Sequence, residues 1–196
     1  MHNHQSECLF QSRECPFRKF SDDKCSWSGI LSDIGGHVRS EHGRKIIEHT
    51  SGLAVTLQNF NTAQRYFKAI SIWGELFYLV WETTNLTFYF SVFHVGHKKE
   101  AEEFIYEFKL GKYRDTISVT GACRSYLQAE REVVKLNECV ALHYRTVQRY
   151  ISESKNLSCE IEIRRKSLVE VNILARRRIL AAPSANAAPS DNAWLA

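Results

Sequence analysis

Four metal-binding side chains near the N-terminus constrain this chain more than any other feature. Nine residues separate Cys15 from Cys25, eleven residues lead on to His37, and His42 follows after four more. Two thiolates and two imidazoles form a ligand set that suits tetrahedral Zn²⁺ and few other metals. We therefore predict a zinc site made of Cys15, Cys25, His37 and His42.

The segment that carries these ligands, residues 15–45, is too short to order itself. Chains below about 40 residues rarely bury enough apolar surface without a metal or disulfides. The zinc would be structural, with no open position for catalytic water. We expect a turn from Cys15 to Cys25, then a helix that bears both histidines, begins after Gly35-Gly36 and stops at Gly43. The module's own small core would consist of Trp27, Ile30, Leu31, Ile34 and Val38. The alternative is an unstructured arm on which cysteine and histidine occur by chance.

A second Cys/His pair precedes this set. His4 and Cys8 have the H-x₃-C spacing that closes a zinc site. The first two ligands of such a site would have to lie before Met1, and His2 would supply only a third. We expect a remnant of a site at His4 and Cys8 that binds no metal here.

Beyond Gly43 the pattern is that of a β-rich domain. Residues 53–57, 104–110 and 157–163 alternate between apolar and polar side chains, and residues 87–95 are dense in aromatic and β-branched types. Further strands are expected at residues 65–73, 75–83, 115–119 and 138–142, with a helical turn near 147–151 and an irregular or partly helical stretch at 126–134. Seven or eight short strands without a βαβ rhythm predict an antiparallel β-sandwich.

Composition limits the possible functions. The formal net charge of +4 is mild, and Arg176–Arg178 supply three of the positive charges, so charge alone indicates neither nucleic acid nor an anionic membrane. No apolar run approaches the ~20 residues that span a bilayer, and no secretory signal is visible at the start. The cysteines lie among histidines or singly in apolar surroundings, a pattern that favours metal ligation and buried thiols over disulfides. We therefore expect a reducing compartment, the cytoplasm or the nucleus.

Several motifs, in order, resemble the seven-in-absentia (SIAH/Sina) family. Residues 25–29, Cys-Ser-Trp-Ser-Gly, followed by the eleven-residue gap to His37, resemble that family's second zinc finger. His4-x₃-Cys8 falls where the family keeps the last ligands of its first finger. Residues 92–126 and 138–163 resemble the family's substrate-binding domain.

The resemblance implies a mainly β fold, a TRAF-like antiparallel sandwich with a small N-terminal zinc-finger module. Such a domain would dimerise, bind degradation-motif peptides along an exposed strand edge and serve ubiquitin-dependent proteolysis. On this chain the edge would include residues 66–68 and 157–161, and the implied peptide-binding residues are Tyr66, Phe67, Lys68, Leu157 and Glu160. Because Tyr66 replaces the family's groove tryptophan and Glu160 an asparagine, we do not expect the usual peptide motif to bind unchanged.

The same resemblance divides most of the chain into a first-finger remnant (1–14), a SIAH-type finger (15–45) and a TRAF-like domain (46–171). The remaining residues, 172–196, are rich in Ala, Ser, Pro and Asn without a core-forming period and predict a disordered tail. The family's RING domain, which docks the E2 enzyme, has no counterpart in the printed sequence, so we expect either a truncated gene model or a RING-less relative. The expected role is an adaptor for degradation targets, or a regulator of full-length relatives. It would pair with itself or with a SIAH-type ligase and reach an E2 only through a RING-bearing partner.

Two other classes of function can be weighed. A nucleic-acid-binding finger could use Arg39, Arg44 and Lys45, but one finger reads only ~3 base pairs, and solvated helix charges are the simpler interpretation. For an enzyme acting alone, no spacing among the remaining histidines and cysteines indicates a triad or a carboxylate pair. These residues are His94, His97, His143, Cys123, Cys139 and Cys159. We predict no catalytic residue.

Overall fold

The computed structural model describes residues 8, 10–21, 23–50, 52–136 and 138–166. Backbone contacts separate residues 1–165 from residues 166–196, and the first of these two units is described here. The predictions made for His4 and for the tail 172–196 lie outside the described residues. Among the described residues, no helix is long and apolar enough to cross a membrane.

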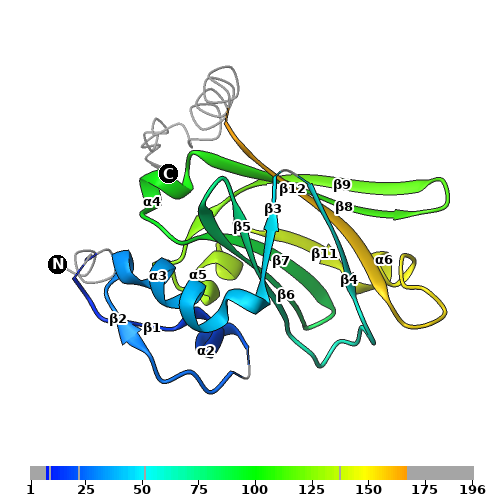
Figure 1. The fold of residues 1–196 in the computed structure, drawn as a ribbon. Coiled ribbons are helices and arrows are strands. Elements are labelled where there is room, and N and C mark those ends of the chain that lie inside the picture. The colour runs from blue at the N-terminus through cyan, green and yellow to red at the C-terminus, as the bar shows by residue number, and fades with distance from the viewer. Residues whose placement is uncertain (1–7, 9, 22, 51, 137, 167–196) are drawn as a thin grey trace, which may run out of the picture. The chain divides into compact units, whose positions relative to one another are not determined.

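Two β-sheets form the body of the unit, as the alternating sequence pattern predicts (Figure 1). The first sheet has the order β10-β7-β6-β5-β3, and β11 also pairs with β7. Its strands are β3 (Ile46–His49), β5 (Tyr66–Ile72), β6 (Glu75–Thr84), β7 (Thr87–His94), β10 (Arg124–Ser125) and β11 (Val140–His143). The second sheet has the order β4-β12-β8-β9, with β4 (Gly52–Leu57), β8 (Phe104–Lys112), β9 (Asp115–Ala122) and β12 (Leu157–Arg165).

Strand pairing is antiparallel within the second sheet and through β5, β6, β7 and β11 of the first. Two short edge strands are exceptions, because β3 runs parallel to β5 and β10 parallel to β7. The fold is therefore mainly β, as the sequence predicts. Three short helices lie in the connections, namely α4 (Lys98–Ala101), α5 (Glu130–Lys135) and α6 (Tyr144–Gln148).

The main core lies between the two sheets. Alternate residues of each strand point inward, so that Trp81 and Phe90 of the first sheet meet Tyr106 and Phe108 of the second. Phe90 stacks on Phe108 with 4.6 Å between ring centroids. Large aromatic rings dominate this core, and their burial is the principal stabilising term of the sandwich.

The outer face of the first sheet is also buried, because the N-terminal module packs on it. This module contains β1 (Arg13–Glu14), α2 (Pro16–Phe20), β2 (Ser28–Gly29), α3 (Leu31–His42) and the 3₁₀ turn η1 (Gly43–Lys45). A second apolar cluster joins module and sheet. From the module it takes Cys15, Phe17, Phe20, Leu31, Ile34 and Val38, and from the sheet Ala69, Leu76, Tyr78, Val80 and Phe93. The unit therefore has three layers: the module, the first sheet and the second sheet.

The sequence-based predictions of the module's helix start and of its separate core are both wrong. The histidine-bearing helix begins at Leu31 and runs through Gly35-Gly36, so the glycines lie inside it and not before it. The module's core is also not its own: Leu31, Ile34 and Val38 pack against the sheet, while Trp27 is only half-buried. Packing against the first sheet stabilises this helix. This tertiary packing offsets the low helix propensity of the two glycines.

Candidate metal centre and sheet edge

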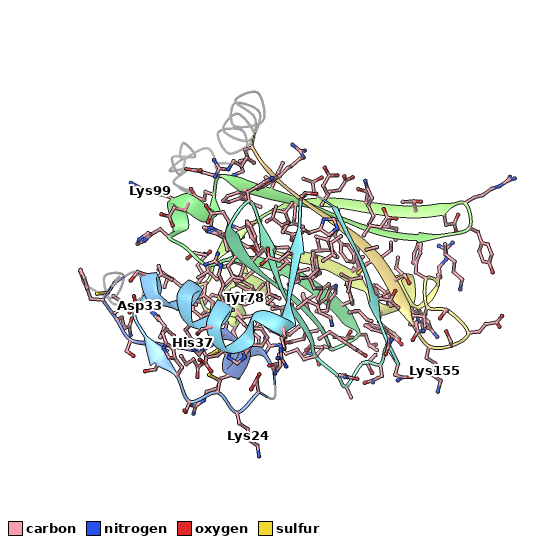
Figure 2. All side chains as sticks on the ribbon, viewed as in Figure 1. Lys24, Asp33, His37, Tyr78, Lys99 and Lys155 are labelled. Atoms are coloured by element: carbon pink, nitrogen blue, oxygen red, sulfur yellow. The ribbon has the colours of Figure 1, made fainter. Side chains whose placement is uncertain are left out.

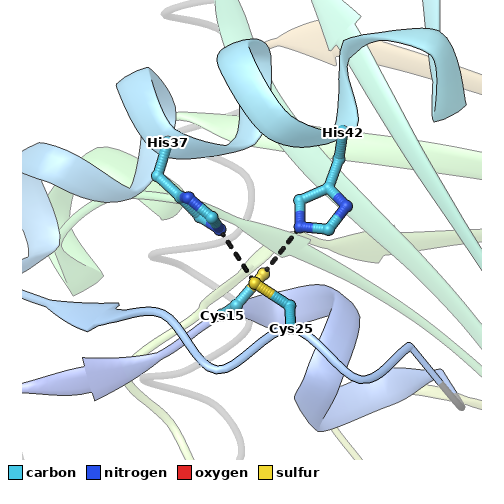
Figure 3. Close-up of side chains that lie close together, drawn as sticks. All are labelled: Cys15, Cys25, His37 and His42. Carbon is cyan, nitrogen blue, oxygen red and sulfur yellow. Dashed lines mark hydrogen bonds between the residues drawn. The ribbon is translucent and has the colours of Figure 1, made fainter.

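The four predicted ligands come together from two sides of the module (Figure 3). Cys15 caps the start of α2, where Pro16 occupies the first helical position and needs no hydrogen-bond acceptor. Cys25 lies in the loop between α2 and β2, and His37 and His42 project from the last turns of α3. Cys15, His37 and His42 are buried, while Cys25 is partly exposed.

The ligand atoms of these residues converge on one point. All four lie within 4.8 Å of one another. Cys15 Sγ is 3.4 Å from His42 Nε2, and Cys25 Sγ is 3.4 Å from His37 Nε2. Each histidine presents the same ring nitrogen to a sulfur, so this cluster can hold a metal ion.

Aromatic rings fix both imidazoles. The Trp27 ring stacks on His37 with 4.4 Å between centroids and an angle of 2°, and Phe17 stacks on His42 at 4.3 Å and 14°. Trp27 reaches this place because Gly29 has no side chain: a Cβ there would fall 2.5 Å from the indole ring. The rings therefore hold the two histidines in position before any metal binds.

A carboxylate orients the second histidine from behind. Asp23 Oδ2 lies 3.4 Å from His42 Nδ1 and 2.6 Å from Lys45 Nζ. The hydrogen bond from Lys45 lowers the pKa of Asp23, which stays ionised. A carboxylate on the far nitrogen fixes the tautomer that leaves Nε2 free as a ligand, an arrangement common behind metal-bound histidines.

Burial controls the protonation of the metal-free cluster. Desolvation raises the pKa of the Cys15 thiol to about 11 and lowers the pKa of His37, which the nearby His42 lowers further. At neutral pH a metal-free Cys15 is therefore a thiol and His37 a neutral imidazole. A metal that takes Cys15 as thiolate must release its proton, so binding weakens as pH falls.

Sequence reasoning did not find Asp23 or Phe17. An acidic residue two positions before Cys25 and a phenylalanine two positions after Cys15 are the only signals, and such neighbours are common in any sequence. Cys8 is partly exposed and is not a member of the four-residue cluster, which is the only such group among the described residues. His4, its proposed partner, lies outside them.

The remaining histidines have local structural contacts. His94 Nε2 lies 3.0 Å from Glu75 Oε2, His97 belongs to the capping box at the start of α4, and His143 Nδ1 accepts a hydrogen bond from Arg145 N at the start of α6. Cys123 and Cys159 are buried and Cys139 is partly exposed, with no disulfide among the cysteines. Burial raises the pKa of Cys159 to about 12.

The five residues implied for peptide binding are not brought together. Tyr66, at the start of β5, donates its phenolic hydrogen to Asn59 O and accepts from Asn61 N, each at 3.2 Å. Phe67, the next residue, faces the module instead and stacks on Phe20 at 5.8 Å. Lys68 is exposed.

The second implied segment does not form an edge. Residues 157–161 belong to β12, which pairs with β4 on one side and, from Cys159 onward, with β8 on the other. Leu157 is fully buried in the main core, and Glu160 points to solvent from the outer face. The prediction of an edge at 157–161 is therefore wrong, because β4 covers it and is itself the edge strand.

Residues 70–162 match the family model described as Sina, TRAF-like domain, and this stretch runs from β5 to β12. The probable E3 ubiquitin-protein ligase sinah of Drosophila melanogaster is 28% identical over 169 residues, which are 83% of this chain and 47% of that protein. The E3 ubiquitin-protein ligase siah-1 of Caenorhabditis briggsae is 26% identical over 83% of this chain and 39% of that protein. The E3 ubiquitin-protein ligase sina of Schistosoma mansoni is 23% identical over 82% of this chain and 44% of that protein. The chain spans less than half the length of each of these relatives.

Proposed function

Because this chain belongs to the seven-in-absentia (Sina/SIAH) family, we propose that it is a zinc-binding recognition module that selects proteins for ubiquitin-dependent degradation. The observation that carries this proposal is the match of residues 70–162 to the Sina TRAF-like domain. The matched stretch contains most of a sandwich whose sheet edges can accept a target peptide.

Zinc is the metal we propose for the four-residue cluster. Bonds of ~2.3 Å to sulfur and ~2.05 Å to nitrogen, at tetrahedral angles, separate the two ligand atoms by about 3.6 Å. The measured separations of 3.4 Å agree with this value. All four positions would be filled by Cys15, Cys25, His37 and His42, so the metal would stabilise the module and activate no water.

Two open strand edges support peptide recognition. Among the described strands, β4 pairs only with β12. Residues 66–68 of β5 pair there only with β6, because β3 begins to pair at Ala69. An extended peptide can add to such an edge through backbone hydrogen bonds. The Phe60 ring stacks on the Tyr66 ring with 5.5 Å between centroids. One face of the Tyr66 ring is therefore covered and cannot contact a bound peptide. This supports the inference that the family's usual peptide motif is not bound unchanged.

The partners follow from the same proposal. We expect the chain to pair with itself or with a SIAH-type ligase, to reach an E2 through a RING domain on a partner, and to act in the cytoplasm, with the nucleus as a second location. A regulator of full-length relatives would make the same contacts but would protect targets from degradation. The half-life of captured proteins therefore separates an adaptor from a regulator.

Affinity capture tests this function directly. The tagged chain should recover ubiquitin-pathway proteins and copies of itself or of a SIAH-type ligase. A Cys15→Ser/Cys25→Ser variant should lose both through loss of its fold, whereas the matched Cys8→Ser variant should retain them. Capture that yields no ubiquitin-pathway protein and no dimer partner would refute the proposal.

The structure disfavours the alternative of a DNA-binding finger. The Arg39 guanidinium donates to Gly74 O at 2.5 Å, and Lys45 pairs with Asp23. The apolar face of α3, including Ile34 and Val38, is buried on the sheet. Two of the three candidate DNA-contacting cations, Arg39 and Lys45, are therefore already engaged within the chain.

A further inference from the structure

The structure points to a basic recognition surface where the open edge at residues 66–68 of β5 meets the N-terminal module. We propose that this basic cleft binds an extended acidic segment of a partner protein. The inference rests on the proposed function, because residues 66–68 form one of the two strand edges proposed there for peptide recognition. It adds the basic side chains of the N-terminal module and the acidic character of the ligand.

The cleft has a volume of about 850 Å³ and opens to solvent. Its apolar floor includes Phe17, Ile46 and Phe67. Its sides carry Lys24, Arg44 and Lys45 from the module and Lys68 from β5. Module and sandwich therefore both contribute to a single binding surface.

The chain path explains why an unpaired strand edge borders this cleft. The residues directly before β3 form the 3₁₀ turn η1, which connects α3 to β3 and is not part of a strand. β3 pairs with β5 only from Ala69 onward, so no strand of the described part of the chain pairs with residues 66–68 on that side. Three residues of free edge extend for ~10 Å and offer backbone donors and acceptors to an added strand.

The charges around the cleft favour an anionic occupant. Lys24, Arg44 and Lys68 are exposed and form no ion pair with any described residue. Among the described residues of the lining, Asp23 is the only acidic one, and Lys45 Nζ pairs with it at 2.6 Å. Lys24 extends from the rim into solvent, where it can meet an approaching chain (Figure 2). Uncompensated like charges around one groove raise the local concentration of an oppositely charged ligand.

A peptide fits this surface better than a nucleic acid. The open edge of β5 supplies hydrogen bonds that match a polypeptide backbone, while three exposed cations would release few counterions from a polynucleotide. The chain's own last residues do not match the cleft in charge, because residues 167–196 contain Arg176–Arg178 and only Glu170 and Asp191 as acids.

Fluorescence anisotropy with defined probes tests the proposal on the zinc-loaded full chain. The probes are labelled peptides of alternating Glu and Val, the same peptides with Lys in place of Glu, and a 12-nucleotide single-stranded DNA. The Glu peptide should bind, and more weakly as salt rises. Lys24→Glu/Arg44→Glu should weaken it at least about tenfold, because attraction at two positions becomes repulsion.

Matched variants keep the test decisive. Arg114→Glu/Arg145→Glu makes the same change in net charge at two exposed positions elsewhere and should bind the Glu peptide like the wild type. If Lys24→Glu/Arg44→Glu loses zinc, Lys68→Glu tests the cleft from the sandwich side. Equal weakening by both double variants, no effect of either cleft variant, or tighter binding of the DNA would overturn the proposal. None of these results bears on capture of ubiquitin-pathway proteins, so the two proposals fail separately.

Discussion

Replacing Phe20 with alanine tests whether the N-terminal module and the sandwich fold as one unit. Phe20 is 3% exposed, and its ring lies 5.8 Å from Phe67, 5.7 Å from Phe93 and 6.2 Å from Tyr126, centroid to centroid. A buried Phe→Ala change typically costs about 3–5 kcal/mol. Lost aromatic contacts add to this cost, and the surrounding rings cannot collapse into the space left. We therefore expect the free energy of unfolding to fall by about 4 kcal/mol.

The assay is urea unfolding of the zinc-loaded chain, followed by hydrogen exchange of β6 amides. β6 lies under the module on one face and in the main core on the other. Phe20→Ala should lower the protection of β6 amides by nearly the full loss in unfolding free energy. The control is Phe10→Ala, at a residue 81% exposed, which should change stability by less than about 0.5 kcal/mol. If Phe20→Ala weakened metal binding but left β6 protection intact, the single-unit argument would fail.

Three further changes probe single features of the module. Gly36→Ala should stabilise the chain by about 0.5–1 kcal/mol in thermal unfolding, because Gly36 lies inside α3 and a Cβ there meets nothing within 4 Å; destabilisation would place the helix boundary elsewhere. Asp23→Asn should weaken zinc binding about 10–100-fold in a chelator competition, since it removes the carboxylate behind His42; unchanged affinity would mean that the stacked Phe17 ring alone orients the imidazole. Lys19→Met should raise stability at pH 7 by about 1–2 kcal/mol, because burial lowers the pKa of Lys19 to about 8 and folding therefore opposes its charge. As pH rises from about 8 to 10.5 the folded wild type loses this proton first and gains stability, so its difference from the variant should shrink; a difference that grew with pH would contradict the assignment.

The sandwich could be predicted from sequence because its strands are long and their residues alternate. β12 alternates between buried and exposed positions along its first seven residues, and β6 and β7 are so rich in aromatic and β-branched residues that no other element fits them. The Cys/His cluster, which could hold a metal ion, was predictable for a different reason. Its chemistry depends on residue type and approximate spacing, which survive uncertainty about where each helix begins.

The edge of the second sheet could not be predicted, because alternation says which face a residue occupies and nothing about its neighbours. The alternating pattern around Leu157 and Glu160 is that of any half-buried strand, whether it lies in the centre or at the edge of a sheet. Only the pairing of β12 with both β4 and β8 shows that this strand is internal. The start of α3 was missed for a local reason, since Gly35-Gly36 is a strong helix-breaking signal that burial of Ile34 and Val38 on the sheet overrides.

The sequence predicts a domain boundary at residue 46. In the structure, one apolar cluster joins the module before this boundary to the first sheet after it. Without the module, the outer face of the first sheet would expose Ala69, Leu76, Tyr78, Val80 and Phe93, all now 3% exposed or less. At about 2 kcal/mol for each large side chain, the lost burial approaches the total stability of a typical domain. A chain of residues 46–166 should therefore aggregate or bind a hydrophobic dye, whereas a chain of residues 1–166, which lacks only the last segment, should stay monodisperse or form a defined dimer. Size-exclusion chromatography with dye fluorescence distinguishes these outcomes. A soluble 46–166 chain that unfolds cooperatively would show that the module is an accessory and not a layer of the fold.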